Sequence, residues 1–135
     1  MSTRNTSERR KGLGYACVIA AACMVALAPG GSAQGNDKPY DDKLLRISEI
    51  LGAVHYLREL CGANEGQAWR EKMRELIASE GSTALRRARL IRSFNQGYQG
   101  YSRTYKECTP TAKTAISRFM TEGATLAEGL LRSVP

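Results

Sequence analysis

The sequence predicts an all-α fold, a small up-down bundle of four helices with one disulfide between the C-terminal ends of helices one and three. Apolar residues recur at helical spacing in four successive segments, and turn residues separate these segments. No segment shows the two-residue alternation of a long strand. The chain has 135 residues, which is enough for one domain and too few for two domains with ordinary cores.

Residues 1–33 have the pattern of a cleaved signal peptide. A basic start precedes an uncharged, largely apolar stretch at 15–27, and helix breakers and small residues follow it. We therefore expect cleavage after Ala33 and export to the periplasm. A retained membrane anchor is an alternative, but the apolar stretch is shorter than the ~20 residues that a helix needs to cross a bilayer. A twin-arginine signal and a lipid-modified Cys23 are two further alternatives.

The cysteines predict the disulfide. Cys17 and Cys23 lie within the expected signal peptide, so the mature chain retains Cys61 and Cys108. A cysteine pair in an oxidising compartment is expected to be bonded, and the chain-entropy model gives such a loop about 4 kcal/mol of stability. Two buried free thiols are the alternative. In an up-down bundle, helices one and three run parallel, so their C-terminal ends, where the two cysteines lie, meet at one pole.

The mature chain is expected to start with a flexible polar leader at 34–40, followed by a single helical domain at 41–135. The first helix is expected at about 42–61, because an aspartate pair can cap its start and Gly62 can end it. Its inward positions are Ile47, Ile50, Leu51, Val54, Leu57 and Cys61. Asn64 is the expected cap of a short second helix. The apolar stripe of that helix consists of Trp69, Met73, Leu76 and Ile77.

Helices three and four have clear start signals. Ser82 or Thr83 is expected to open the third helix, and Thr109 followed by Pro110 the fourth. The inward positions of helix three are Leu90, Ile91, Phe94, Tyr98, Tyr101, Tyr105 and Cys108. Those of helix four are Ala112, Ile116, Phe119, Leu126 and Leu130.

The charge of the mature chain argues against nucleic acid as a partner. The whole chain has 20 basic and 13 acidic residues, of which the segment 1–33 carries four and one. A net charge of about +4 then remains, which favours weak contact with anionic polymers or lipid head groups. An unidentified envelope protein or cell-wall polymer is therefore the expected partner, without stable membrane insertion after cleavage.

Polar and aromatic residues are expected to gather near the disulfide. Arg58 falls inside the apolar arc of helix one, so its guanidinium needs an acceptor, and Glu65 and tyrosine hydroxyls are available. The cluster is either a buried polar network that fixes helix register or a ligand pocket, and its aromatic residues are either core or a platform on which sugars stack. The predicted binding residues are Arg58, Glu65, Trp69, Tyr98 and Tyr101.

Three residues are catalytic candidates. His55 and Glu59, one helical turn apart, have the spacing of a base and its orienting carboxylate, and a Glu65 beside an indole is expected to have a raised pKa. No nucleophile motif such as Gly-x-Ser-x-Gly accompanies them. One histidine and a bonded cysteine pair predict no metal site, and without Cys-x-x-Cys-His there is no covalent haem. We therefore expect no cofactor.

A basic face is predicted on the outside of helix three. Its residues are Arg86, Arg89 and Arg92. Such a stripe is either a solvated helix face or a docking surface for an acidic partner or an anionic envelope polymer. Arg87 is angled inward and is expected to pair with an acidic residue of helix one or two.

Several stretches together resemble a known family. They read Pro-Tyr-Asp-Asp-Lys-Leu-Leu-Arg from residue 39, His-Tyr-Leu-Arg-Glu-Leu-Cys-Gly from residue 55, Trp69-Arg70, Ala-Arg-Leu-Ile from 88, Phe-Asn-Gln-Gly-Tyr from 94 and Cys108-Thr109. Over nearly all of residues 39–120 the chain resembles a family of small secreted alphaproteobacterial proteins classed as a domain of unknown function. The resemblance implies a periplasmic protein of a Gram-negative cell, supplies no catalytic residues, and leaves the tail after Glu122 uncovered.

The expected function is a non-enzymatic periplasmic interaction or adaptor module in cell-envelope maintenance. The alternative is a small cell-wall hydrolase that uses Glu65 or the His55/Glu59 pair.

Overall fold

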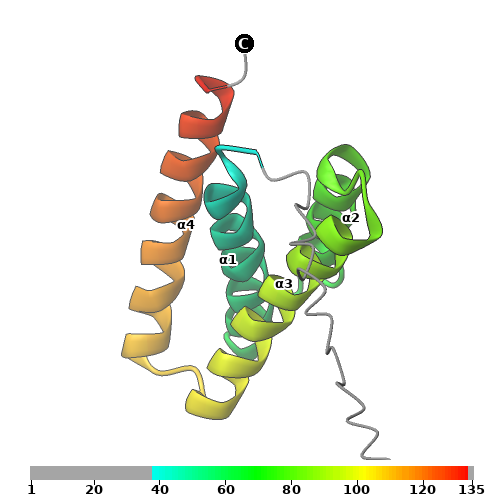
Figure 1. The fold of residues 1–135 in the computed structure, drawn as a ribbon. Helices are drawn as coiled ribbons and strands as arrows, with labels where there is room; N and C mark the ends of the chain where they lie inside the picture. Colours follow the sequence, from blue (N-terminus) through cyan, green and yellow to red (C-terminus); the bar gives the residue numbers. More distant parts are fainter. Residues whose placement is uncertain (1–37, 134–135) are drawn as a thin grey trace, which may run out of the picture. The chain divides into compact units, whose positions relative to one another are not determined.

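A computed structural model describes residues 38–133 of the chain. It contains the helices α1 (Asp41–Leu60), α2 (Ala68–Glu80), α3 (Ala84–Thr104) and α4 (Pro110–Leu131), and the described residues form no strand (Figure 1). The prediction of an all-α domain with four helices is confirmed. The expected signal peptide, its cleavage after Ala33 and the start of the leader lie outside the described residues. Among the described helices, none has the length and apolar character that a membrane span requires.

Two threonines open the later helices. The Thr83 hydroxyl accepts a hydrogen bond from the backbone N–H of Arg86, and the Thr109 hydroxyl accepts one from that of Ala112, each at 3.1 Å. Pro110 occupies the first turn of α4, where no backbone N–H is needed.

The start of α2 differs from the prediction. Asn64 was the expected cap, but α2 begins at Ala68, after Gln67. Asn64 has φ 34°, between the left-handed Gly62 and Gly66 with φ 76° and 55°. A capping residue has an extended backbone, so a left-handed Asn64 forms part of a turn instead, and the prediction is wrong.

The helix α1 is central and packs against the other three, with α4 on one side and α2 on the other (Figure 1). It approaches α3 most closely where Gly52 meets Gly97. A Cβ atom built on Gly52 would lie 1.9 Å from the Phe94 carbonyl oxygen, and one on Gly97 would lie 2.0 Å from the Glu49 carbonyl oxygen. Only glycine fits at either position, so the two backbones are in direct contact.

The predicted disulfide is present. Cys61 and Cys108 are bonded, with their Cα atoms 4.9 Å apart. At the opposite end of the same helix pair, Asp41 at the start of α1 contacts Arg86 in the first turn of α3. One contact joins the starts of the two helices and the other joins the residues that follow their ends, so α1 and α3 run in the same direction.

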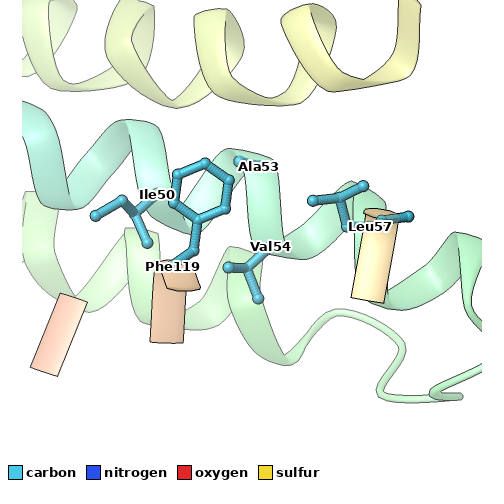
Figure 2. Close-up of a cluster of buried hydrophobic side chains, with 6 residues drawn as sticks. Ile50, Ala53, Val54, Leu57 and Phe119 are labelled. Carbon is cyan, nitrogen blue, oxygen red and sulfur yellow. The ribbon is translucent and has the colours of Figure 1, made fainter. Parts of the chain in front are cut away.

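Two clusters of buried side chains form the core. Phe119 of α4 lies beside Ile50 and Val54 of α1 in the first cluster (Figure 2). The second cluster, between α1, α2 and α3, consists of Leu44, Met73, Leu90 and Phe94. Ile91 was predicted to face inward, but it is 45% exposed. The close crossing of α1 and α3 buries only a narrow stripe of α3, and Ile91 lies beside that stripe.

Candidate functional site

Arg58, Glu65 and Trp69 form one cluster at the C-terminal end of α1. Arg58 donates from Nε to Glu65 Oε2 at 2.6 Å, and its Nη2 donates to the other carboxylate oxygen. The Trp69 indole N–H donates to Glu65 Oε2, and the Arg58 guanidinium lies 6.0 Å from the centre of the Trp69 ring. The prediction that Arg58 requires an acceptor is confirmed, and Glu65 is that acceptor. The turn after α1 places Glu65 between them.

The ionisation of Glu65 differs from the prediction. Hydrogen bonds from Arg58 and from Trp69 hold the pKa of Glu65 below its ordinary value, and they outweigh partial burial, which acts in the opposite direction. The expected raised pKa is therefore wrong. The reason is geometric: the Arg58 guanidinium, which has the larger effect, and the indole N–H of Trp69 both donate to the carboxylate and stabilise its charged form.

Glu65 and Trp69 also line an open groove between α1 and α2, with a volume of about 730 Å³. Ile47 and Leu51 form its α1 wall. The other lining residues are Ala68, Lys72, Glu75, Leu76 and Ser79. Lys72 and Glu75 pair with each other at 3.1 Å, so the charged side chains of the groove are matched. Ile47 and Leu51 were predicted to face the core, but they line this groove instead. The groove was not predicted, because helical periodicity does not report how fully a neighbouring helix covers an apolar face.

His55 lies in the core between α1, α2 and α3 and is only 2% exposed. Its ring lies 6.1 Å from that of Phe94 and 5.7 Å from that of Tyr98. Arg70 Nε donates to His55 Nε2 at 3.2 Å, so this nitrogen carries no hydrogen and Nδ1 carries the hydrogen of the neutral ring. Burial lowers the pKa of His55; the charge of Glu59 opposes this effect and the charge of Arg70 adds to it.

The predicted base and orienting carboxylate are close but not hydrogen-bonded. His55 Nδ1 lies 3.8 Å from Glu59 Oε1, and it has no hydrogen-bond partner within the described part of the chain. A catalytic role for this pair stays a prediction.

Tyr98 and Tyr101 lie away from the groove. Tyr98 packs on His55 and meets the Tyr56 ring edge-on at 5.5 Å. Tyr101 stacks on Tyr105 at 6.0 Å and meets Phe119 of α4 edge-on at 5.1 Å. The structure therefore brings together three of the five predicted binding residues and places these two tyrosines against the core instead.

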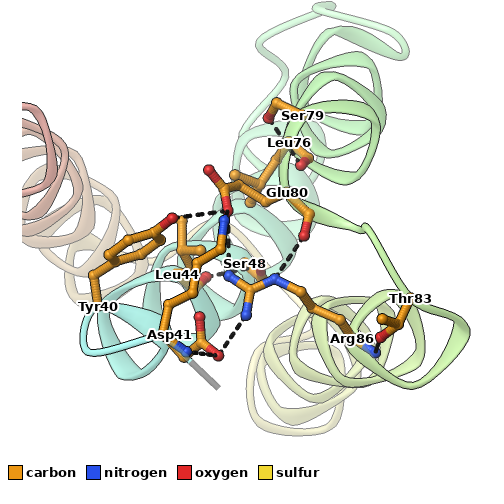
Figure 3. A network of polar contacts seen from close by, with 10 residues as sticks. Tyr40, Asp41, Leu44, Ser48, Leu76, Ser79, Glu80, Thr83 and Arg86 are labelled. Atoms are coloured by element: carbon orange, nitrogen blue, oxygen red, sulfur yellow. Dashed lines mark hydrogen bonds and ion pairs between the residues drawn. The ribbon is translucent and has the colours of Figure 1, made fainter. Parts of the chain in front are cut away.

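Arg86 does not belong to the predicted basic face. Arg86 is 7% exposed and donates to Asp41 Oδ2 at 2.5 Å and to the Glu80 backbone oxygen at 2.6 Å (Figure 3). Its placement on the outside of helix three is wrong, because the short link after α2 turns the first turn of α3 toward the ends of α1 and α2. Arg89 and Arg92 are exposed as predicted.

Arg87 is also placed differently. It is exposed, and its Nη1 donates to the backbone oxygen of Gly81 at 2.8 Å. The expected pairing with an acidic side chain is therefore wrong. The C-terminal carbonyls of α2 take that role, because the last carbonyls of a helix have no partner within the helix.

Comparison with known proteins identifies the family and no closer relative. No curated protein and no solved structure matches the chain. A family model matches residues 39–133, so the prediction that the resemblance ends near Glu122 is wrong. The family is described as "Protein of unknown function (DUF2385)", which confirms the predicted membership of a family without an assigned function. On this match, the chain belongs to that family.

Proposed function

We propose that this domain is a non-enzymatic interaction module of the bacterial periplasm, and that its α1–α2 groove binds an amphipathic helix of an envelope protein. The groove itself carries the proposal. Its volume of about 730 Å³ lies within the range of roughly 300–1,000 Å³ that is common for binding sites. The exposed surface of its walls is mostly apolar, so a bound partner would remove apolar surface from water.

The spacing of the walls favours a helix as the occupant. Ile47 and Leu51 are one helical turn apart on α1, and Trp69 and Leu76 are two turns apart on α2. Side chains with this spacing form ridges that pack into the grooves between the side chains of a third helix, as in other helix-in-groove complexes. The groove is also open to solvent, whereas an acyl chain is best shielded from water by an enclosed tunnel.

The charges favour an apolar partner over a charged polymer. Glu65 is bonded to Arg58, and Lys72 to Glu75, so the groove presents no unmatched carboxylate or ammonium group. Attraction of a charged cell-wall polymer would require a net potential at the site. Contact between apolar side chains requires none.

The periplasmic location rests on the signal-like pattern of residues 1–33 and on the Cys61–Cys108 bond, since disulfides persist mainly in oxidising compartments. Expression of the full chain in a Gram-negative host tests this part. We expect the protein in the periplasmic fraction with Gln34 as its first residue. A full-length chain in the cytoplasm would contradict it.

Binding can be followed with the protein's own fluorescence, because Trp69 is the single tryptophan of the chain and lies in the groove wall. The probe is a synthetic amphipathic peptide with leucines at helical spacing, compared with a scrambled peptide of the same composition. We expect a saturable blue shift of Trp69 emission with the first peptide only. Leu51→Glu should weaken this binding about tenfold or more, because it places a charge in the apolar wall.

Leu85→Glu is the matched control, because Leu85 is 46% exposed and does not line the groove. It should leave the affinity within about twofold of the wild type, and circular dichroism verifies that both variants fold. Equal loss in both variants, or equal binding of the scrambled peptide, overturns the proposal. A Trp69 shift caused by phospholipid vesicles and by neither peptide overturns it in favour of a lipid ligand.

A further inference from the structure

A second depression, of about 250 Å³, lies between α2 and α3 and does not share a lining residue with the groove. Arg70, Arg74 and Asn95 supply its polar groups. The buried side chains of Met73 and Phe94 complete the lining. No acidic residue lines it, so its lining combines hydrogen-bond donors with apolar side chains.

Several of these donors are available. Arg70 uses only Nε within the described part of the chain, in its bond to His55, which leaves both terminal nitrogens. Arg74 uses Nη1 for Glu71, in an exposed pair three residues apart, and Asn95 makes no side-chain hydrogen bond to the described residues. A guanidinium fork binds two oxygens of one anion at once, which makes a carboxylate or a tetrahedral oxyanion the matching ligand.

We propose that this depression binds a small oxyanion through Arg70, Arg74 and Asn95, and that His55 positions Arg70 for it. His55 is 2% exposed, so its ring is held by the core, and its Nε2 fixes one edge of the Arg70 guanidinium. Arg70 lines the depression, and its two terminal nitrogens remain for a ligand there. A long side chain that is already held loses less conformational entropy when a ligand binds, so a fixed arginine binds more tightly than a free one.

This arrangement requires neutral His55. Protonation would replace the acceptor at Nε2 with a donor and would place a cation against the Arg70 guanidinium. The groups that face His55 are Glu59 from α1, Arg70 from α2 and Tyr98 from α3. Since burial lowers the pKa of His55 from 6.5, the bond to Arg70 persists at neutral pH and is lost in acid. Affinity for the anion should therefore fall in acid, as the pH falls through the lowered pKa of His55.

Sulfate and acetate are the probes, because they present a tetrahedral and a planar oxyanion whose charges stay constant from about pH 8 down to about pH 6. Binding to the full-length protein is measured by NMR at constant ionic strength in chloride. We expect saturable binding of one of them, and Arg70→Gln should weaken it about tenfold. Arg92→Gln is the matched control, since Arg92 is exposed on α3 and lies outside the depression, and it should change the affinity by less than about twofold. No saturable binding of either ion, or equal loss in both variants, overturns the site.

The positioning role of His55 has a separate test. His55→Gln keeps an acceptor for Arg70 and should retain most of the affinity without the pH dependence, whereas His55→Leu removes the acceptor and should lose it. Circular dichroism identifies variants that fail to fold. If neither variant folds, the pH dependence of sulfate affinity in the wild-type protein still tests the role of His55. Sulfate affinity that is constant from about pH 8 to about pH 5 in the wild type overturns the role of His55.

Discussion

The two ends of the α1–α3 pair each hold an arginine against a carboxylate, but they do so in different surroundings. At the start of α1, the Arg86 side chain is 8% exposed and the Asp41 side chain 16%. At its end, Arg58 and Glu65 are 31% and 29% exposed, and the covalent Cys61–Cys108 bond lies nearby. A buried pair is costly to break, whereas solvent screens an exposed pair. One end therefore depends on ionic contacts for stability, while the other depends on the disulfide, and its ion pair lies at the edge of the groove.

Arg86→Met should have the largest effect. It removes the ion-pair partner of Asp41 and one of the two partners of Glu80, which keeps Lys38, and it leaves the partly buried charge of Asp41 without a cation, which costs up to about 5 kcal/mol of unfolding free energy. Urea denaturation followed by circular dichroism measures this. Arg92→Met, at an exposed position of the same helix, should change the unfolding free energy by no more than about 0.5 kcal/mol. Similar losses in the two variants would show that Arg86 is not a structural residue.

Loss of the disulfide should come next. A Cys61→Ser/Cys108→Ser double variant removes a crosslink between residues 47 positions apart, which the chain-entropy model values at about 4 kcal/mol at most. The midpoint of urea denaturation of the variant, compared with that of the oxidised wild-type protein, measures the effect, and the reduced wild-type protein is the control for the variant. The two should agree, because both lack only the bond. A midpoint equal to that of the oxidised wild-type protein would mean that helix packing alone stabilises this end of the helix pair.

Acid should weaken the end that contains Arg86. Burial opposes ionisation of Asp41, but hydrogen bonds from Arg86 and from the Lys38 backbone outweigh it and lower the pKa of Asp41 below 3.8. A lowered pKa contributes stability above the unfolded-state value, and this stability is lost as the pH falls through the lower folded-state value. Denaturation midpoints between pH 5 and pH 2 should therefore fall more in the wild type than in Asp41→Asn. Parallel curves for the two proteins would contradict the assignment.

Arg58→Met should have the smallest effect on stability. The pair is about one-third exposed, so solvent screening reduces its contribution to about 1 kcal/mol or less. The pKa of Glu65, measured by NMR, should rise toward its ordinary value at the same time, because the hydrogen bond from Arg58 is the main cause of its lowering. A loss as large as that of Arg86→Met would remove the distinction between the two ends.

The sequence was sufficient to predict what depends on local pattern. Helical periodicity and turn residues indicated four helices, and Thr83 and Thr109 are caps whose chemistry acts within three residues. The disulfide was also predictable, since the expected cleavage after Ala33 would leave two cysteines, and these lie near the ends of two helices.

Contacts between distant segments were not predictable in the same way. The helical wheel of α3 places Arg86 outside, but Asp41 and Glu80 reach it from two other helices, and no pattern within α3 reports this. The groove was missed for a related reason. Apolar residues of α1 occur around most of its circumference, which was a signal that several helices pack on it, but periodicity does not report how much of α1 the short α2 covers.

The glycine contact between α1 and α3 determines how this domain can assemble. Because Gly52 and Gly97 are the points where the two backbones touch, the helix pair can close in one register only, and a shift by one residue would bring a Cβ atom against a carbonyl oxygen. In this register the Cα atoms of Cys61 and Cys108 lie 4.9 Å apart, within the range that a disulfide requires, so the packing that aligns the helices also aligns the cysteines. Bond formation then makes that choice permanent.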